Sequence, residues 1–250
     1  MKKHIPNIIT LMNLFFGCFA IMMLITGKFN LAILYIGLAS IMDFGDGLTA
    51  RAFKVQSNIG KELDSLADMV SFGFIPGLIL FMLFQIGFQA NESIFNQSLS
   101  GFGSKLLETP YLYGFTGFLV TLFSALRLAK FNLDTRQSES FIGLNTPSNT
   151  FLIVGFLFIY IENTFGLRDL MTNPIFLTIA SIVLSILLVS ELPMFSLKFK
   201  KLQWKDNEVK ISFLLLSILL FILFKGPAIA LIMLTYITFA IISNLFKKQV

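Results

Sequence analysis

Residues 43–68 read DFGDGLTARAFKVQSNIGKELDSLAD, a segment with several charged side chains in an otherwise apolar chain. It contains the four aspartates Asp43, Asp46, Asp64 and Asp68. Carboxylates are costly within a bilayer, so ionisable residues at membrane depth usually face a water-filled cavity and mark a functional site. We therefore take this segment as the first candidate for a site and ask what kind of fold surrounds it.

The aspartates fall on two helical stripes joined by a short connection, residues 52–62. The first stripe recurs at i, i+3, i+4 and i+7 and consists of Asp43, Asp46, Gly47 and Ala50. The second recurs at i, i+4 and i+8 and consists of Gly60, Asp64 and Asp68. Two helices facing each other would direct four carboxylates into one volume, and the small residues would leave room for a bulky ligand. Such an oxygen-rich site suits Mg²⁺ or Mn²⁺. The alternative is that the aspartates cap helices or pair with Arg51 and Lys61, but capping does not require this spacing.

The composition excludes an ordinary soluble domain. Of the 250 residues 56% are hydrophobic, 30 are phenylalanine, and the mean hydropathy is +0.81. Apolar runs close to the ~20 residues that cross a ~30 Å hydrocarbon core occur at 7–27, 30–50, 67–87, 110–130, 149–166, 173–192, 209–225 and 227–246. We predict an all-α integral membrane protein, a bundle of about eight transmembrane helices that forms a single domain over residues 1–250.

The distribution of basic residues predicts the orientation of this bundle. If the N-terminus is cytoplasmic, all but Lys28, Lys105, Arg168 and Lys225 of the 19 lysines and arginines fall on the cytoplasmic side. Both termini are then cytoplasmic, and the aspartates lie at the cytoplasmic ends of the second and third spans. The net charge is +5, and the basic residues lie beside the ends of the spans. We therefore expect these residues to contact anionic lipids of the bilayer, and we expect no binding of nucleic acid.

The spacing of the aspartate segment resembles a family signature. The pattern DxxDGxxARx8GxxxDxxxD is matched without a gap by Asp43, Asp46, Gly47, Ala50, Arg51, Gly60, Asp64 and Asp68. It is similar to the signature of the CDP-alcohol phosphotransferases, membrane enzymes that transfer a phosphatidyl group or a phosphobase from a CDP-linked donor to an acceptor hydroxyl.

Further stretches resemble the phosphatidylserine synthase branch of that family: PNIITLMNLFFG from Pro6, LDSLADMVSFG from Leu63, ALRLAKFN from Ala125 and FIGLNTPS from Phe141. The branch implies CDP-diacylglycerol and L-serine as substrates and phosphatidylserine and CMP as products. It also implies two Mg²⁺ or Mn²⁺ ions on the four aspartates, Asp68 as general base, a homodimer, and a site facing the cytoplasm from the cytoplasmic (inner) membrane.

The resemblance also points to residues that would contact the substrates. For the CDP group these are Asn7, Thr10, Asp46, Gly47, Ala50, Arg51 and Gly60. Arg51 has a second interpretation as a membrane-end anchor, and Asn7 and Thr10 have one as interhelical hydrogen-bonding residues.

For the serine carboxylate we expect a contact with two cations, Arg127 and Lys130, which stand at i and i+3 and are followed by Asn132. Both cations are equally explained as positive-inside anchors.

Two function classes follow from the residues. A metal-dependent phosphatidyltransferase explains the full spacing, whereas a cation transporter explains only intramembrane carboxylates. Within the enzyme class, glycerol 3-phosphate or inositol phosphate could replace serine. A phosphorylated acceptor needs several cations around its phosphate, and the small set around Arg127 better suits one carboxylate.

Overall fold

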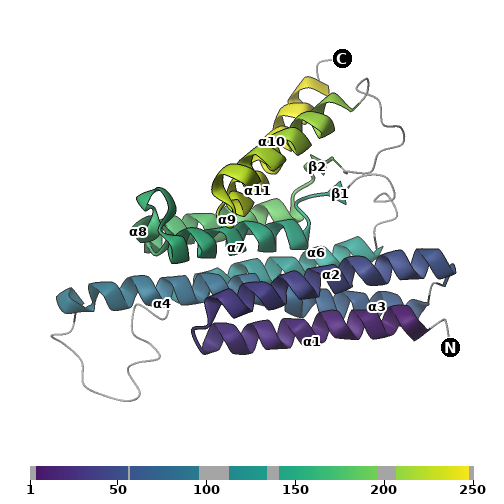
Figure 1. The fold of residues 1–250 in the computed structure, drawn as a ribbon, viewed down its shortest axis with the longest axis horizontal. Helices are drawn as coiled ribbons and strands as arrows, with labels where there is room; N and C mark the ends of the chain where they lie inside the picture. Colours follow the sequence, from purple (N-terminus) through teal and green to yellow (C-terminus); the bar gives the residue numbers. More distant parts are fainter. Residues whose placement is uncertain (1–3, 56, 96–112, 134–140, 196–206, 248–250) are drawn as a thin grey trace.

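The computed structural model describes residues 4–55, 57–95, 113–133, 141–195 and 207–247 (Figure 1). These residues are almost entirely helical, as predicted. The main helices are α1 (Ile5–Ile25), α2 (Phe29–Phe53), α3 (Asn58–Asp68), α4 (Ile75–Phe95), α6 (Leu119–Leu133), α7 (Thr146–Glu162), α9 (Pro174–Val189), α10 (Glu208–Phe224) and α11 (Ala228–Lys247). Short helical turns are η4 (Phe115–Phe118), η5 (Thr164–Gly166) and α8 (Arg168–Met171), and a π-helical turn, η2 (Met69–Phe74), joins α3 to α4.

Each predicted span coincides with a helix in the described part of the chain. By length and composition, Ile5–Ile25, Phe29–Phe53 and the continuous helix Asn58–Phe88 are able to cross a membrane. Apolar helices of fewer residues cover Thr146–Glu162, Pro174–Val189 and Ala228–Asn244. Residues 110–112 of the predicted span 110–130 lie outside the described residues.

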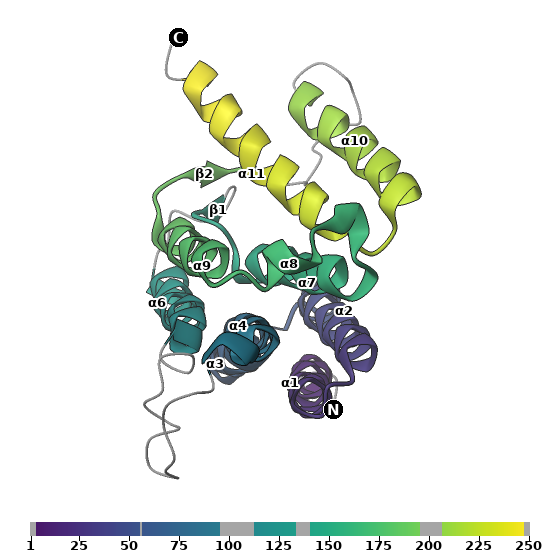
Figure 2. The ribbon, with the colours of Figure 1, turned by 90° about the vertical axis from the view of Figure 1, so that its left-hand side faces the viewer.

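The helices are arranged in layers (Figure 2). The helices α1, α2, α3–α4 and α6 form one layer, α7 and α9 cover it, and the inclined pair α10 and α11 packs on α7. The helix α4 is enclosed on several sides, because α1, α6, α7 and α9 all contact it. Its side chains Leu80, Leu83 and Phe84 are fully buried. This central helix is therefore a rigid support for α3, which continues directly into it.

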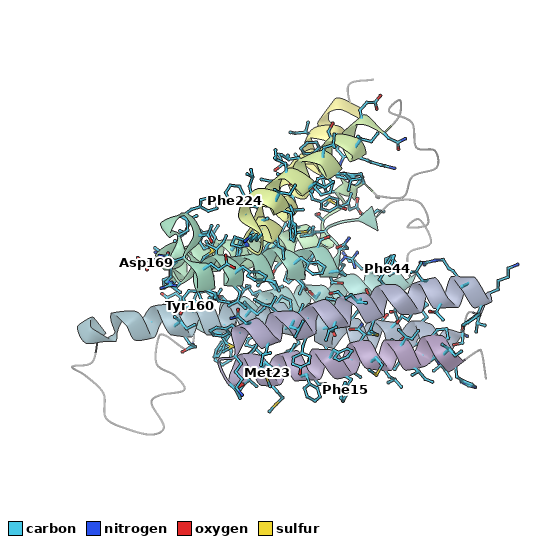
Figure 3. All side chains as sticks on the ribbon, viewed as in Figure 1. Phe15, Met23, Phe44, Tyr160, Asp169 and Phe224 are labelled. Carbon is cyan, nitrogen blue, oxygen red and sulfur yellow. The ribbon has the colours of Figure 1, made fainter. Side chains whose placement is uncertain are left out.

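The outer surfaces of the first two helices are apolar. Phe15 of α1 and Phe44 of α2 are 51% and 65% exposed (Figure 3). Exposed aromatic side chains of this size are unfavourable in water and suit a hydrocarbon environment. Thr10 and Asn13 of α1 and Asp46 of α2 are instead buried.

The structure adds one element that the sequence pattern did not predict. Phe141–Ile142 (β1) and Pro193–Met194 (β2) pair as antiparallel two-residue strands, with Phe141 opposite Met194. Gly143 follows with a φ of +76°, and a β-carbon there would lie 2.8 Å from the carbonyl oxygens of Leu188 and Ser190. Glycine is therefore required for this close approach, which attaches the start of α7 to the end of α9.

Candidate active site

The connection between the two aspartate helices is shorter than residues 52–62. The helix α2 continues to Phe53 and ends at Lys54, which adopts the left-handed conformation. The next helix begins after Ser57, whose side-chain oxygen accepts a hydrogen bond from the Gly60 backbone N–H at 3.0 Å. Serine is a favoured N-cap because it satisfies a free N–H at the helix start. Only residues 54–57 separate the two helices.

Three of the four aspartates converge across these helices. Asp43 of α2 and Asp64 and Asp68 of α3 each present a carboxylate oxygen, and these oxygens lie within 4.8 Å of one another. Two oxygen ligands on opposite sides of a divalent cation lie about 4–5 Å apart, since each ligand distance is about 2.0–2.6 Å. The donor set and its spacing therefore fit Mg²⁺ or Mn²⁺. We call these three residues the carboxylate cluster.

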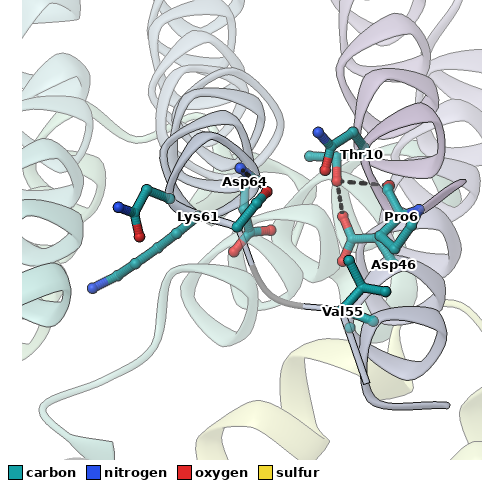
Figure 4. Close-up of a pocket in the computed structure, with 12 residues that line it drawn as sticks. Pro6, Thr10, Asp46, Val55, Lys61 and Asp64 are labelled. Carbon is teal, nitrogen blue, oxygen red and sulfur yellow. Dashed lines mark hydrogen bonds between the residues drawn. The ribbon is translucent and has the colours of Figure 1, made fainter. Parts of the chain in front are cut away.

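Asp46 stands apart from the carboxylate cluster because it is bound to α1. Its Oδ2 accepts a hydrogen bond of 2.5 Å from the Thr10 hydroxyl, whose oxygen also lies 3.1 Å from the Pro6 carbonyl (Figure 4). Asp46 is 7% exposed and Thr10 is 3% exposed. The contact between two buried side chains fixes α1 against α2 at the level of the cluster.

Asn13 is a site residue that the sequence interpretation did not select. Its Nδ2 donates to Asp68 Oδ1 at 3.3 Å, and its own Oδ1 has no hydrogen-bond partner among the described residues. Asn13 is fully buried. The sequence does contain an indication of this role, because Asn13 follows Thr10 by three residues and so lies on the same face of α1.

A cavity of about 610 Å³ opens between α1, α2 and α3. Most residues that we expected to contact the CDP group line it: Asn7, Thr10, Asp46, Gly47, Ala50 and Gly60, together with Asp64 of the cluster. Pro6, Val55, Ser57, Asn58 and Lys61 line it as well (Figure 4). The structure thus brings together residues from three helices that are separated along the chain.

Two glycines give the cavity its shape. A β-carbon on Gly60 would lie 3.0 Å from both Asn7 Oδ1 and Ser57 Oγ, so α3 approaches α1 closely here. A β-carbon on Gly47 would lie 3.4 Å from Arg51 Nη1, because the Arg51 side chain folds back along α2. Arg51 itself is exposed and does not line the cavity. Its guanidinium stands beside Gly47, at the border of the cavity.

Arg127 belongs to α6, which packs against the π-helical turn that follows Asp68 and against α4. The Thr121 hydroxyl donates to the Gly73 carbonyl at 2.9 Å, and Asn132 Nδ2 donates to Ser65 Oγ at 2.8 Å. These two contacts show that α6 runs antiparallel to the α3–α4 helix. Arg127 lies between them and therefore beside Asp68, with which its charge interacts. Its side chain is 6% exposed.

The other two residues expected at the acceptor occupy different environments. Lys130 is exposed. The Asn132 side chain donates a hydrogen bond to Ser65, and the backbone carbonyl of Asn132 accepts a hydrogen bond of 2.7 Å from Lys61 Nζ. The structure thus brings Arg127 to the aspartates, leaves Lys130 on the surface, and places Asn132 in a link between α6 and α3.

Several buried polar groups of α6 and α7 lack hydrogen-bond partners within the described part of the protein. They are Arg127 Nε, Ser124 Oγ, Thr146 Oγ1 and both amide atoms of Asn149. The charge of Arg127 also interacts with Tyr236. Buried polar groups usually have hydrogen-bond partners, so this concentration marks the region between α6 and α7 as able to accept a polar ligand.

Comparisons with known proteins agree with this arrangement. Residues 3–189 match the profile of the family described as CDP-alcohol phosphatidyltransferase. A CDP-diacylglycerol–serine O-phosphatidyltransferase of Helicobacter pylori is 31% identical over 245 residues, which cover 96% of this chain and 91% of that protein. The Bacillus subtilis protein of the same name is 29% identical over 190 residues, covering 76% and 89%.

A more distant relative is the archaetidylserine synthase of Methanothermobacter thermautotrophicus, 27% identical over 159 residues, covering 61% of this chain and 59% of that protein. Residues 3–189, which match the family profile, include the helices α1, α2 and α3 around the cavity and the helix α6 that carries Arg127. The chain belongs to the CDP-alcohol phosphatidyltransferase family.

Proposed function

We propose that this protein transfers the phosphatidyl group of CDP-diacylglycerol to the hydroxyl group of L-serine and releases CMP. The observation that carries the proposal is the convergence of Asp43, Asp64 and Asp68 beside a cavity between three helices. The names of the relatives in Helicobacter pylori and Bacillus subtilis support serine as the acceptor.

The cavity is the proposed site of the CDP group. Its volume of about 610 Å³ lies in the ordinary range for small-molecule sites. The proposed contacts are Asn7, Thr10, Asp46, Gly47, Ala50, Arg51 and Gly60. The guanidinium of Arg51 stands at the border of this cavity, where it can bind a phosphate oxygen of the diphosphate.

The carboxylate cluster is the proposed metal site. Asp43, Asp64 and Asp68 have the donor type and spacing for Mg²⁺ or Mn²⁺, and Asp46 completes the ligand set for two ions. Bound divalent cations neutralise the charge that develops on the transferring and leaving oxygens in a phosphoryl transfer.

Asp68 is the proposed general base. The serine hydroxyl oxygen forms a bond to the lipid-side phosphorus while its proton passes to the Asp68 carboxylate. The bond between that phosphorus and the bridging oxygen breaks, and CMP leaves with this oxygen. The amide of Asn13 donates to Asp68 Oδ1 and so orients the carboxylate. Orientation of the base by a third group is common to such sites.

Arg127 is the proposed partner of the serine carboxylate. It is the buried cation beside Asp68, and guanidinium binds carboxylate through two parallel hydrogen bonds. Lys130 and Asn132 are proposed to act at the entrance to the acceptor site, where Lys130 is exposed. A single buried guanidinium suits one carboxylate better than a phosphorylated acceptor.

The cavity is formed at the N-terminal end of α1 and the C-terminal end of α2 (Figure 1). If the N-terminus is cytoplasmic, as the distribution of basic residues predicts, the site opens toward the cytoplasm. We propose this orientation in the cytoplasmic membrane, with both termini inside and the protein acting as a homodimer.

The test is a product assay with purified protein. CDP-diacylglycerol and Mg²⁺ or Mn²⁺ are supplied with serine, glycerol 3-phosphate or inositol phosphate, and the products are separated by mass. We expect phosphatidylserine and CMP with serine alone. Exclusive formation of phosphatidylglycerophosphate would agree with the family but exclude serine as the acceptor. Ion flux into vesicles that contain the protein, without CMP release, would indicate a transporter.

A further inference from the structure

The helix that carries Asp64 and Asp68 changes its winding directly after Asp68. Residues Met69–Phe74 form a π-helical turn between α3 and α4, and the Ile75 backbone N–H bonds to the Val70 carbonyl, five residues back. Turns of this kind occur mostly as single insertions in α-helices and often at functional sites. This turn fixes how α3, with its carboxylates, is rotated relative to the enclosed helix α4.

A proline next to this turn removes one of its backbone hydrogen bonds. In an α-helix the N–H of residue 76 would bond to the carbonyl of Phe72. Residue 76 is Pro76, which has no N–H and which is buried. The Thr150 hydroxyl from α7 bonds to the Phe72 carbonyl at 3.0 Å. A side chain from another helix thus supplies a donor to a carbonyl of the π-helical turn, next to a position that has no N–H.

The Thr150 hydroxyl lies between two carbonyl acceptors. Thr150 is fully buried, and its hydroxyl also lies 2.9 Å from the Thr146 carbonyl of its own helix. The next carbonyl of the turn, Gly73, accepts a bond from Thr121 of α6. Two consecutive carbonyls of the π-helical turn thus accept hydrogen bonds from threonines of two neighbouring helices, α7 and α6.

We infer that Thr150 is a positioning residue: its hydroxyl bonds to the Phe72 carbonyl within the π-helical turn, stabilises that turn and so holds Asp68 in the carboxylate cluster. A shift of one residue along a helix corresponds to a rotation of about 100°. Loss of the π-helical turn would rotate Asp64 and Asp68 away from Asp43. The activity measurements below rest on the proposed function, whereas the metal-binding measurement does not.

The first experiment compares three variants of the full-length protein. Thr150→Val removes the hydroxyl at nearly constant volume, Thr150→Ser retains it, and Thr235→Val is the control. The Thr235 hydroxyl bonds only within its own helix, to the Ile232 carbonyl. We measure kcat, the KM for CDP-diacylglycerol, the thermal unfolding temperature and Mn²⁺ binding by electron paramagnetic resonance.

Thr150→Val is expected to weaken Mn²⁺ binding and to lower kcat by about 10-fold to 100-fold, the usual effect of removing a group that orients a ligand. The KM for CDP-diacylglycerol should change less than kcat, because Thr150 does not line the cavity. Thr150→Ser and Thr235→Val should remain near the wild type. Wild-type Mn²⁺ binding in a folded Thr150→Val variant would overturn the inference.

A double-mutant cycle with Pro76 tests the reason for the effect. Pro76→Ala supplies a backbone N–H at position 76 that reaches the Phe72 carbonyl in an α-helical register, so this carbonyl should depend less on Thr150. Thr150→Val should therefore reduce Mn²⁺ binding far less in the Pro76→Ala background than in the wild type. Equal losses in both backgrounds would contradict the inference, even if both variants were less stable. Absence of CMP release by the wild type would instead contradict the proposed function.

Discussion

The Thr10 hydroxyl donates a hydrogen bond of 2.5 Å to Asp46 Oδ2, and this contact joins the first two helices at the cavity. Both side chains are buried and both line the cavity. A hydrogen bond to an ionised group contributes more than one between neutral groups. The orientation of Asp46 toward the proposed CDP group therefore depends on a residue of a different helix.

Thr10→Val removes this hydrogen bond and should raise the KM for CDP-diacylglycerol by roughly 30-fold, the equivalent of about 2 kcal/mol for a hydrogen bond to a charged group. Thr10→Ser should retain most of the affinity. Thr49→Val is the matched control, since the Thr49 hydroxyl bonds to the Gly45 carbonyl of its own helix. An unchanged KM for the Thr10→Val variant would show that the contact does not orient Asp46 for binding.

Gly60→Ala should impair binding of the CDP group, because the new β-carbon would lie 3.0 Å from Asn7 Oδ1 and Ser57 Oγ. The displaced side chains border the cavity, so we expect a loss of about tenfold or more in kcat/KM, as for other small displacements in active sites. Gly37→Ala is the control: nothing lies within 4 Å of a β-carbon there. Equal activity of the two variants would contradict the close approach of α3 to α1.

Much of this site could be predicted from residue spacing alone. The positions of four aspartates on two helical stripes were enough to expect a common volume. The structure brings three of them together, Asp43, Asp64 and Asp68, while Asp46 stands apart. The apolar runs likewise predicted the positions of the helices. Both results depend on local periodicity, which a sequence contains directly.

The features that were missed depend on contacts between distant segments. The role of Thr150 requires knowing that α7 lies beside the π-helical turn, and the bond from Asn13 to Asp68 requires the packing of α1 on α3. Lys130 and Arg127 have the same local pattern, yet only Arg127 is buried. Helix rotation and packing decide these cases, and neither can be obtained from spacing within one helix.

Asp68→Asn should nearly abolish turnover while CDP-diacylglycerol still binds. The amide cannot accept the proton of the serine hydroxyl, and the loss of a general base lowers rates by about 10²-fold to 10⁴-fold. Asp68 does not line the cavity, so the nucleotide contacts should persist. CMP release and binding of CDP-diacylglycerol are measured on the same preparation. Full activity of this variant would exclude Asp68 as the base.

Substitutions of Arg127 and Lys130 should have different effects, although both residues were expected at the acceptor site. Arg127 is 6% exposed and lies beside Asp68, whereas Lys130 is on the surface. Arg127→Ala removes the proposed partner of the serine carboxylate, and we expect kcat/KM for serine to fall by about 100-fold, the size of a lost charged hydrogen-bonded pair. Lys130→Ala should change it by less than about threefold, since exposed charge pairs contribute little.

The comparison of these two variants depends on measuring both substrates. Truncation of a buried arginine can also destabilise the protein, so the KM for CDP-diacylglycerol and the unfolding temperature are recorded with the KM for serine. Arg127→Lys keeps the charge but not the planar fork that pairs with a carboxylate, and it should recover only part of the serine affinity. A larger effect of Lys130→Ala than of Arg127→Ala on the KM for serine would move the acceptor site to the surface end of α6.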